Sequence, residues 1–432
     1  MGKFLYAALC VASLAACGSE GDVAQYGGEP RLPEQQTGLV PAMQIATPAS
    51  WRGALPTVPD GYVITALATD LRIPRQILVA PNGDILVAEG SGGGAPKLRP
   101  KDVIAGIIKG RGHSDVEGGD RITLLRDTNG DGRAELRTIL LDDLNAPYGL
   151  AYVDGSLYVA NQDALYRYPY TPGQTRITAA GRKVTDLPSA LNHHWTKALA
   201  ASPDGSRLYV GIGSNSNITE RGMAAEVDRA MIWEIDPEDG AHRPYATGLR
   251  NPSALAIEPR TGRLWAAVNE RDELGANLVP DYMTAVREGA FYGWPYSYWG
   301  QHVDPRVHPQ DSQMVASAVR PDYSLGSHVA PLGLAFSMPA LGQAFAEGVF
   351  VGEHGSWNRR SFSGYKVVFV RFREGRPAGK PVDFVTGFLS DGEARGRPVG
   401  VAVDPRGALF VADDLSNTVW RVAPVAASPV AQ

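Results

Sequence analysis

Apolar and polar residues alternate in a short pattern that recurs along the chain. Each copy has an apolar stretch, a turn, and a second alternating stretch that ends in polar residues. The first stretches are 76–79, 149–152, 198–201, 254–257, 333–336 and 400–403, and the second are 85–89, 157–161, 208–211, 264–269, 349–353 and 409–413. Two alternating stretches on either side of a tight turn predict a β-hairpin.

Six such hairpins indicate a repeat architecture rather than a single large core. A large β-sandwich is the alternative, but it does not explain six copies of one pattern. Helix is scarce, and residues 281–288 predict at most a turn or two. We therefore predict an all-β fold, a six-bladed β-propeller over residues 51–424.

The first residues predict an export signal rather than part of the fold. Lys3 is followed by a mostly apolar stretch over 4–14 and then by Leu14-Ala15-Ala16-Cys17. This ending resembles the bacterial lipoprotein signal, which implies removal of residues 1–16 and a lipid anchor at Cys17. By the same resemblance, Gly18 favours the outer membrane, facing the periplasm. An ordinary secretory signal and a periplasmic protein are the alternative.

Composition outside the repeats adds the remaining boundaries. Residues 17–50 are rich in Gly, Pro, Gln and Glu and predict a flexible tether, and residues 425–432 predict a disordered tail. A net charge of -5 argues against nucleic acid as the main partner. The two cysteines, Cys10 and Cys17, both precede the tether, so the domain has no disulfide and no haem-attachment pair.

Polar residues gather just before the first strand of each hairpin. Because all six positions precede their repeats in the same way, we expect them on one face around a channel. They are Arg75, Gln76, Pro147, Tyr148, His193, His194, Arg250, Asn251, His328, Ala330, Pro331, Arg395 and Arg397. Several arginines at one mouth predict a polyanionic ligand, because they would otherwise repel one another. The alternative is pairing with nearby acids such as Glu270, Asp272 and Glu393.

Five motifs carry a resemblance to a known family. They are residues 249–252 (LRNP), 269–275 (NERDELG), 291–296 (FYGWPY), 354–359 (HGSWNR) and 395–400 (RGRPVG). They resemble the L-sorbosone dehydrogenase family, related to soluble glucose dehydrogenases and aldose sugar dehydrogenases that use pyrroloquinoline quinone (PQQ). The resemblance covers nearly the whole chain after residue 55. It implies Ca²⁺ as a second cofactor, a sugar, sugar-aldehyde or polyol substrate, and a separate respiratory electron acceptor.

The resemblance also implies cofactor-binding residues. Arg250 and Asn251 match the family's cofactor-contacting pair, and Arg395 and Arg397 match its Arg-x-Arg pair. The loop Arg271-Asp272-Glu273 matches the calcium loop, so Asp272 and Glu273 are the expected metal ligands and Arg271 a cofactor contact. Relatives use Gly-Pro carbonyls there, whereas this chain has Asp-Glu.

His194 matches the family's general base, which takes the proton of the substrate hydroxyl while hydride passes to the quinone. A neutral imidazole suits that task. His193 is the competing residue. Where soluble glucose dehydrogenase orients its histidine with an Asp, this chain has Ser214 and Asn215, so one of these must take that role.

Further contacts come from other blades. Gln76 is a candidate substrate or cofactor contact. His354, Trp357 and Arg359 match a cofactor-side or substrate-side cluster of the family, and Trp357 is either a stacking residue or a buried structural one.

Residues 127–135 (DTNGDGRAE) have alternating oxygen side chains, as calcium loops do. The twelfth loop position is Thr138 instead of a bidentate Glu. The segment also fits a hairpin turn, so a structural calcium and a plain turn both remain open.

Two other function classes fit parts of the pattern. A calcium-dependent lactonase-like hydrolase would draw metal ligands from several blades, with Glu89, Asn161, Asn269 and Asp413 as candidates. It gives the arginine pairs no role. A non-catalytic propeller scaffold leaves the charged rim unexplained.

Overall fold

The computed structural model describes residues 25–36, 43–93, 117–359 and 361–425. Nearly every regular element in these ranges is a strand, so the all-β prediction is confirmed. The described part contains one α-helix, α2 (Ser312–Ser317), which Asp311 caps by accepting from the backbone N–H groups of Gln313 and Met314. The predicted signal and Cys17 lie outside the described residues, as do residues 426–432 of the predicted tail.

Six antiparallel sheets of four or five strands make up the body of the described chain. In chain order, the first three contain β4 (Pro74–Val79), β5 (Ile85–Glu89), β6 (Arg121–Arg126) and β7 (Leu136–Leu141); β8 (Gly149–Val153), β9 (Ser156–Ala160), β10 (Ala164–Pro169) and β11 (Arg182–Asp186); and β12 (Lys197–Ala201), β13 (Leu208–Ile212), β14 (Met231–Ile235) and β15 (His242–Thr247).

The other three sheets contain β16 (Pro252–Ile257), β17 (Leu264–Val268), β18 (Pro280–Ala285), β21 (Tyr323–Ser327) and β1 (Tyr26–Gly27); β22 (Pro331–Phe336), β23 (Gly348–Glu353), β24 (Lys366–Arg373) and β25 (Arg376–Val385); and β28 (Pro398–Val403), β29 (Leu409–Asp413), β30 (Thr418–Pro424) and β3 (Tyr62–Ala68). All six predicted hairpins are present as the first two strands of these sheets. The prediction of a helical turn within 281–288 is wrong, because Asp281 to Ala285 belong to β18.

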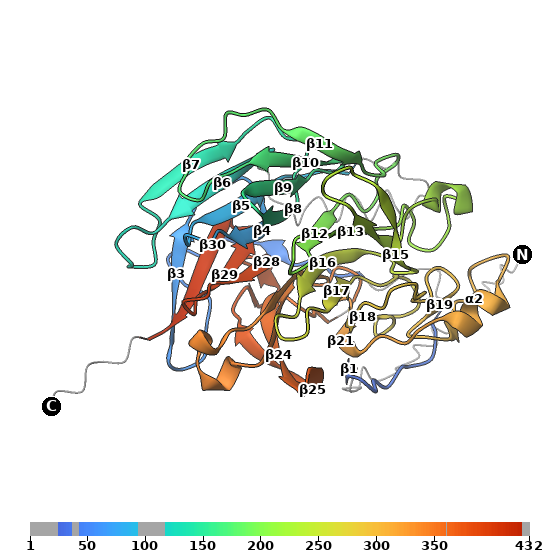
Figure 1. The fold of residues 1–432 in the computed structure, drawn as a ribbon. Helices are drawn as coiled ribbons and strands as arrows, with labels where there is room; N and C mark the ends of the chain where they lie inside the picture. Colours follow the sequence, from blue (N-terminus) through green and yellow to red (C-terminus); the bar gives the residue numbers. More distant parts are fainter. Residues whose placement is uncertain (1–24, 37–42, 94–116, 360, 426–432) are drawn as a thin grey trace, which may run out of the picture.

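The sheets follow one another in a closed order. The first strands contact their neighbours in the sequence β4, β8, β12, β16, β22, β28 and back to β4. Figure 1 shows β4, β8, β12, β16 and β28 near the middle of the molecule, with β7, β11 and β25 toward the outside. The last sheet combines an early strand with three late strands of the chain, because β3 pairs with β30 through Ile64 opposite Val422.

The hydrophobic core lies between neighbouring sheets. Each of the six buried clusters occupies one interface between consecutive sheets, and one of them, with Val87 and Phe410, joins the first sheet to the last. The sheets converge closely at the centre. A Cβ on Gly333 would lie 2.2 Å from the Val399 carbonyl oxygen, so only glycine fits this part of β22.

The predicted flexible tether is wrong for residues 25–36 and 43–50, which pack on the sheets. Tyr26 and Gly27 pair with β21, and Ala46 is buried. The short strand β2 (Thr47–Pro48) pairs with β27 (Glu393–Ala394). We call residues 25–36 and 43–50 the strap. The boundary placed at residue 51 therefore cuts through structure that belongs to the domain.

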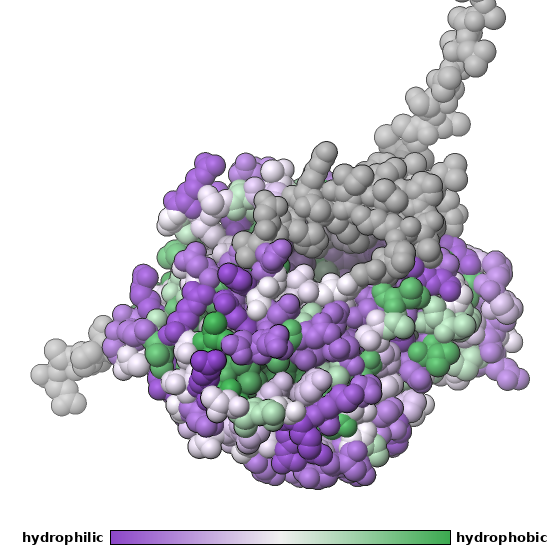
Figure 2. All heavy atoms as spheres, turned by 90° about the horizontal axis from the view of Figure 1, so that it is seen from above, coloured by the Kyte–Doolittle hydropathy of each residue, from purple (hydrophilic) through white to green (hydrophobic). Residues whose placement is uncertain are grey.

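The described residues contain no helix long and apolar enough to cross a membrane. The face seen in Figure 2 is largely polar, with smaller apolar patches between the polar side chains.

Candidate active site

A cavity of about 290 Å³ opens where the loops before the first strands meet. Its lining comes from the loops before β12, β16, β22 and β28, the loops after β17 and β23, and the strap, with Asp281 from β18 and Leu332 from β22. The lining residues are Ile45, His193, His194, Arg250, Asn251, Asn269, Glu270, Asp272, Asp281, His328, Ala330, Leu332, His354, Gly355, Trp357, Asn358, Tyr365 and Arg397. The expectation that residues from separate repeats meet on one face is thus met for four of the six loops.

The His194 imidazole is held by one ring nitrogen. Its Nδ1 lies 2.7 Å from the Ser214 carbonyl oxygen and 3.1 Å from Ser214 Oγ. A carbonyl can only accept, so the neutral ring carries its hydrogen on Nδ1 and has a lone pair on Nε2. Of the two residues expected to orient this histidine, Ser214 does so, whereas the Asn215 side chain accepts from the His193 backbone N–H at 3.2 Å.

The surroundings of His194 favour the neutral ring. Burial and the nearby Arg250 guanidinium hold the pKa of His194 well below its usual range, and His193 adds to the effect. His193 also lines the cavity but is exposed. The His194 ring is therefore an unprotonated base in this site.

Arg250 is buried at the wall of the cavity. Its Nη2 donates to Asn217 Oδ1 at 3.0 Å, and its Nε donates to the Asn217 carbonyl oxygen at 3.2 Å. The same Nη2 lies 3.6 Å from Asp272 Oδ2. Asn217 also accepts from the Asp272 backbone N–H at 2.8 Å. Asn217 thus fixes Arg250 and Asp272 together, and its place in a long insertion between β13 and β14 gave no sequence signal for this role.

Acidic side chains line the same side. Asp281 accepts from the backbone N–H groups of Glu270 and Ala330 at 2.8 Å each, and burial raises its pKa to about 7. The Asp272 carbonyl oxygen accepts from Asn217 Nδ2 at 3.1 Å and Arg306 Nη1 at 3.0 Å. That carbonyl is therefore already used by the protein, and it is the Asp272 side chain that lines the cavity.

His328 and Asn358 complete this wall. His328 Nε2 donates to the Gly275 carbonyl oxygen at 3.2 Å, and Asn358 Nδ2 donates to His328 Nδ1 at 3.0 Å. Asn358 Nδ2 also reaches Asp272 Oδ1. Burial lowers the pKa of His328, which keeps the ring in the neutral form that this hydrogen-bond pattern requires.

His354 and Arg397 lie on the side of β28. His354 Nε2 is 3.0 Å from Asp414 Oδ1, and Asp414 Oδ2 accepts from Arg75 Nη1 at 2.7 Å. Burial and the Arg397 charge lower the pKa of His354 to about 4. Arg397 donates to the carbonyl oxygens of His354 and Gly355 at 3.1 Å each, and its guanidinium lies 5.4 Å from the Tyr365 ring centroid.

Five predicted site residues do not line this cavity: Gln76, Arg271, Glu273, Arg359 and Arg395. The prediction that Arg271 contacts a cofactor is wrong. Its guanidinium is fully buried, donates to Glu270 at 3.0 Å and to the carbonyl oxygens of Pro295 and Ser297 at 2.7 and 2.6 Å. Because all three nitrogens of the Arg271 guanidinium donate hydrogen bonds within the protein, this side chain stabilises the loop after β17.

The other four also lie outside the cavity lining. Gln76 donates to the Leu332 carbonyl oxygen at 2.8 Å. Arg359 donates to the Ser327 carbonyl oxygen at 3.1 Å and to Asn277 Oδ1 at 2.8 Å. Glu273 has a positive φ of 74° and follows the lining residue Asp272, and Arg395 precedes Arg397 by two residues and is half-buried. The structure thus separates the cavity arginines Arg250 and Arg397 from Arg359 and Arg395.

Three buried oxygens on the cavity wall have no hydrogen-bond partner among the described residues: Asn251 Oδ1, Glu270 Oε1 and Asn358 Oδ1. Buried polar atoms are normally satisfied, so their presence beside two arginines indicates a site built for a polar ligand. Of the four metal ligands considered for a lactonase, Asn269 lines this cavity, whereas Glu89, Asn161 and Asp413 do not. Glu89 accepts from Arg121 at 3.0 Å and Asp413 from the Arg397 backbone N–H at 2.8 Å, both away from the lining.

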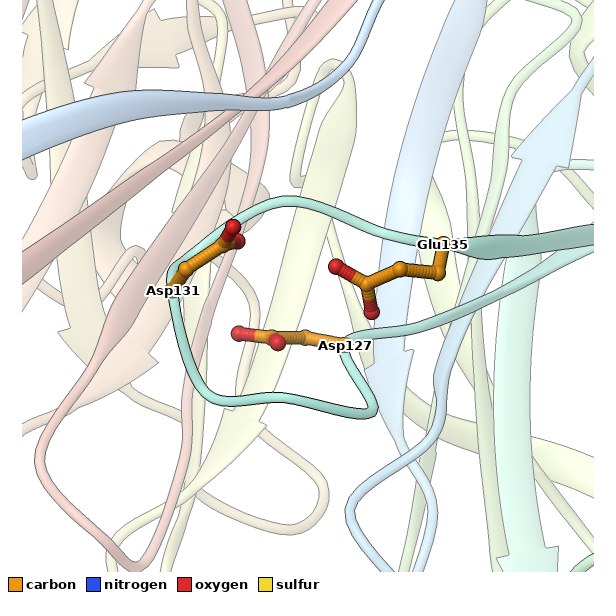
Figure 3. Close-up of side chains that lie close together, drawn as sticks. All are labelled: Asp127, Asp131 and Glu135. Carbon is orange, nitrogen blue, oxygen red and sulfur yellow. The ribbon is translucent and has the colours of Figure 1, made fainter.

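The calcium-like loop lies away from this cavity, between β6 and β7. Asp127, Asp131 and Glu135 direct their carboxylates toward one another (Figure 3), with an oxygen of each within 4.8 Å of the others. Asp127 accepts from the backbone N–H groups of Gly130 and Gly132 at 2.6 and 2.8 Å, and Glu135 accepts from that of Thr128 at 2.7 Å. The loop is therefore held as a hairpin turn by its own hydrogen bonds.

The family model described as TrAA12-like matches residues 116–289 and 297–424, well over half of the chain. The chain belongs to the TrAA12-like family. The resemblance to PQQ-dependent sugar dehydrogenases is thereby confirmed, while its narrower L-sorbosone assignment stays a prediction.

Individual relatives agree with this placement of the TrAA12-like chain. The PQQ-dependent pyranose dehydrogenase of Coprinopsis cinerea is 23% identical over 360 residues, which cover 72% of this chain and 44% of that protein. This chain therefore spans less than half the length of that curated relative.

Solved structures share the fold of the TrAA12-like chain. The holo form of the pyranose dehydrogenase PQQ domain from Coprinopsis cinerea superposes with a TM-score of 0.69 at 21% identity, covering 88% of this chain and 100% of that one. The calcium structure of the Trichoderma reesei family AA12 enzyme gives a TM-score of 0.68 at 20% identity, covering 89% and 99%.

Proposed function

We propose that the protein is a quinoprotein sugar dehydrogenase on a six-bladed β-propeller, with PQQ and Ca²⁺ held in the cavity around His194. The observation that carries this proposal is the meeting of an oriented neutral imidazole with Arg250 and Arg397 in one cavity. Membership of the TrAA12-like family and the names of the relatives support it.

The cavity residues fit the cofactor. PQQ is a flat ortho-quinone with three carboxylates, and Arg250 and Arg397 supply guanidinium groups for anionic oxygens. The unpartnered oxygens of Glu270 and Asn358, together with the Asp272 carboxylate, offer the oxygen ligands that Ca²⁺ prefers. Because the Asp272 carbonyl is already bonded twice, we assign the side chain of Asp272, and not its main chain, to the metal.

The reaction removes a hydride from the carbon that bears a sugar hydroxyl and a proton from the oxygen of that hydroxyl. The quinone, when bound, would supply the electron-accepting carbonyl, and Ca²⁺ would supply Lewis-acid assistance. His194 Nε2 takes the hydroxyl proton, because Nδ1 is held on the Ser214 carbonyl and the ring is neutral. Arg250 would stabilise the anionic cofactor and also favours the unprotonated form of His194, so one guanidinium serves both cofactor binding and the protonation state of the base.

The finer assignments are part of the same proposal. The substrate is a sugar, a sorbosone-like sugar aldehyde or a related polyol. In this proposal the electrons pass to a separate respiratory acceptor, as the family resemblance implies. A lipid anchor at Cys17 would hold the protein at the outer membrane, facing the periplasm.

The test is reconstitution of the protein, truncated before Cys17, with PQQ and Ca²⁺, followed by dye reduction over a panel of aldoses, sugar aldehydes, polyols and lactones. Saturable, sugar-dependent dye reduction supports the proposal. Hydrolysis of a lactone without quinone would favour the lactonase-like alternative. A protein that shows no activity and binds no quinone would favour the non-catalytic scaffold.

A further inference from the structure

The strap joins three loops that carry cavity residues. The Gln36 backbone N–H donates to the Leu274 carbonyl oxygen at 2.8 Å, on the loop of Asp272. The Gln44 backbone N–H donates to the Trp357 carbonyl oxygen at 3.0 Å, on the loop of His354. β2 pairs with β27, just before Arg397. The strap is therefore bonded to the frame of the cavity at three separate places.

One residue of the strap, Ile45, lines the cavity itself. Its backbone is fixed on both sides. Gln44 is bonded to Trp357, while Ala46 is buried at 3% exposure, and the Thr47 backbone N–H donates to the Gly392 carbonyl oxygen at 2.9 Å. The backbone at Ile45 therefore cannot move away without breaking main-chain hydrogen bonds, so this position is a fixed part of the wall.

Ile45 differs in chemistry from most of the lining. His194, Arg250, Asp272 and most of their neighbours offer hydrogen bonds, whereas Ile45 offers only bulk and apolar surface beside Trp357. A branched apolar side chain cannot satisfy a sugar hydroxyl, and it penalises any hydroxyl placed against it. The Ile45 side chain can pack against the C–H face of a sugar ring, and its volume leaves less room for a second sugar ring.

We infer that Ile45 is a specificity-determining residue that limits the size of the sugar accepted by the cavity. This inference rests on the proposed function. The strap thereby acts as part of the active site: its hydrogen bonds hold Ile45 beside Trp357, and the Ile45 side chain favours a monosaccharide over a disaccharide. Removing its outer carbons makes room for the second ring, and enlarging it closes the site further.

The test uses paired substitutions at a cavity and a surface position. Ile45→Ala and Ile45→Trp change the wall, and Leu55→Ala and Leu55→Trp are the matched controls, because Leu55 is 53% exposed and does not line the cavity. For each reconstituted protein, kcat/KM is measured for glucose and for maltose, and the dissociation constant for PQQ is measured by fluorescence quenching.

The expected result is a rise of about tenfold in the maltose-to-glucose ratio of kcat/KM for Ile45→Ala and a fall for Ile45→Trp, since a few carbon atoms in a pocket change selectivity by that order. Both Leu55 variants keep the wild-type ratio, and all four bind PQQ within about twofold of wild type. Unchanged maltose-to-glucose ratios in both Ile45 variants would overturn the inference, whether or not their affinity for PQQ falls.

Hydrogen exchange of the apoprotein separates this inference from the proposed function. The amides of Gln44, Thr47 and Ala49 donate to carbonyl oxygens and should be protected. If the wild type oxidises no sugar, the proposed function fails, whatever the strap does. If these amides exchange as fast as an unstructured peptide, Ile45 is no fixed wall and the inference fails, whatever the activity.

Discussion

At the scale of single residues, two arginines with similar positions in the sequence have side chains in different environments. Arg397 lines the cavity, whereas Arg271 is buried against Glu270 and two carbonyl groups. Both follow or precede a strand at the same rim, so the sequence indicates the rim but not the direction of the side chain. The direction depends on partners such as Pro295 and Ser297, far along the chain, which local pattern cannot reveal.

His194→Gln should lower kcat by about 10²–10⁴-fold and leave the dissociation constant for PQQ nearly unchanged, because the substitution removes the proton acceptor. His193→Gln is the control and should keep most of the activity. Steady-state kinetics and quinone titration of both variants measure this. Normal turnover in His194→Gln would refute the assignment of the base.

Arg397→Ala should weaken PQQ binding by about 2–3 kcal/mol through loss of a charge-assisted contact in the cavity. Arg395→Ala should have little effect, because Arg395 does not line the cavity. Equilibrium titration with PQQ at constant Ca²⁺ compares the two. Equal losses would mean that the family pattern, and not the cavity lining, identifies the cofactor contacts.

Glu353 predicts a pH effect on stability. Burial raises the pKa of this carboxyl to about 8, and within the described part of the chain its Oε2 has no hydrogen-bond partner. The pKa of Glu353 in the folded protein is above the unfolded value of about 4.3. The contribution of this carboxyl to the free energy of unfolding is therefore full at low pH and is lost as pH rises toward 8. Wild type should lose stability relative to Glu353→Gln between pH 5 and 8, on the order of 1 kcal/mol per pH unit.

Urea unfolding of both proteins at several pH values measures this difference. Parallel stability curves for wild type and Glu353→Gln over that range would show that Glu353 is already ionised in the folded protein.

At the scale of elements, the sequence predicted the regular part and missed the irregular part. The six hairpins follow from strict alternation and a tight turn, as between β8 and β9, where Asp154 and Gly155 both have positive φ. The strap has no such alternation. Its order comes from separate contacts, such as Gln25 Nε2 donating to the Asn277 carbonyl oxygen at 2.7 Å. Contacts between distant residues leave no local pattern to read.

Gly333→Ala should destabilise the protein by about 1–3 kcal/mol, because the added Cβ would lie 2.2 Å from the Val399 carbonyl oxygen. Gly28→Ala is the control, since its Cβ would meet nothing closer than 3.4 Å. Denaturant unfolding of both variants measures the difference. Equal stabilities would show that the sheets do not converge as closely as the structure has them.

At the scale of the whole molecule, the closed order of six sheets explains why the site draws on so many parts of the chain. The loops before four of the six first strands reach one cavity, so His194, Arg250, His328 and Arg397 meet although they span about half of the sequence. The pairing of β3 with β30 fixes the order by joining early and late residues in one sheet. The sequence predicted this meeting, but not Asn217 and Asn358, which hold the wall between those loops.

The central claim is that this cavity binds PQQ with Ca²⁺ beside His194. The most direct measurement is isothermal titration of the apoprotein with PQQ, with Ca²⁺ present and after its removal by a chelator. The account predicts saturable binding of one PQQ per chain, much tighter with Ca²⁺ and weakened by Arg397→Ala. Absence of saturable PQQ binding in the presence of Ca²⁺ would contradict it.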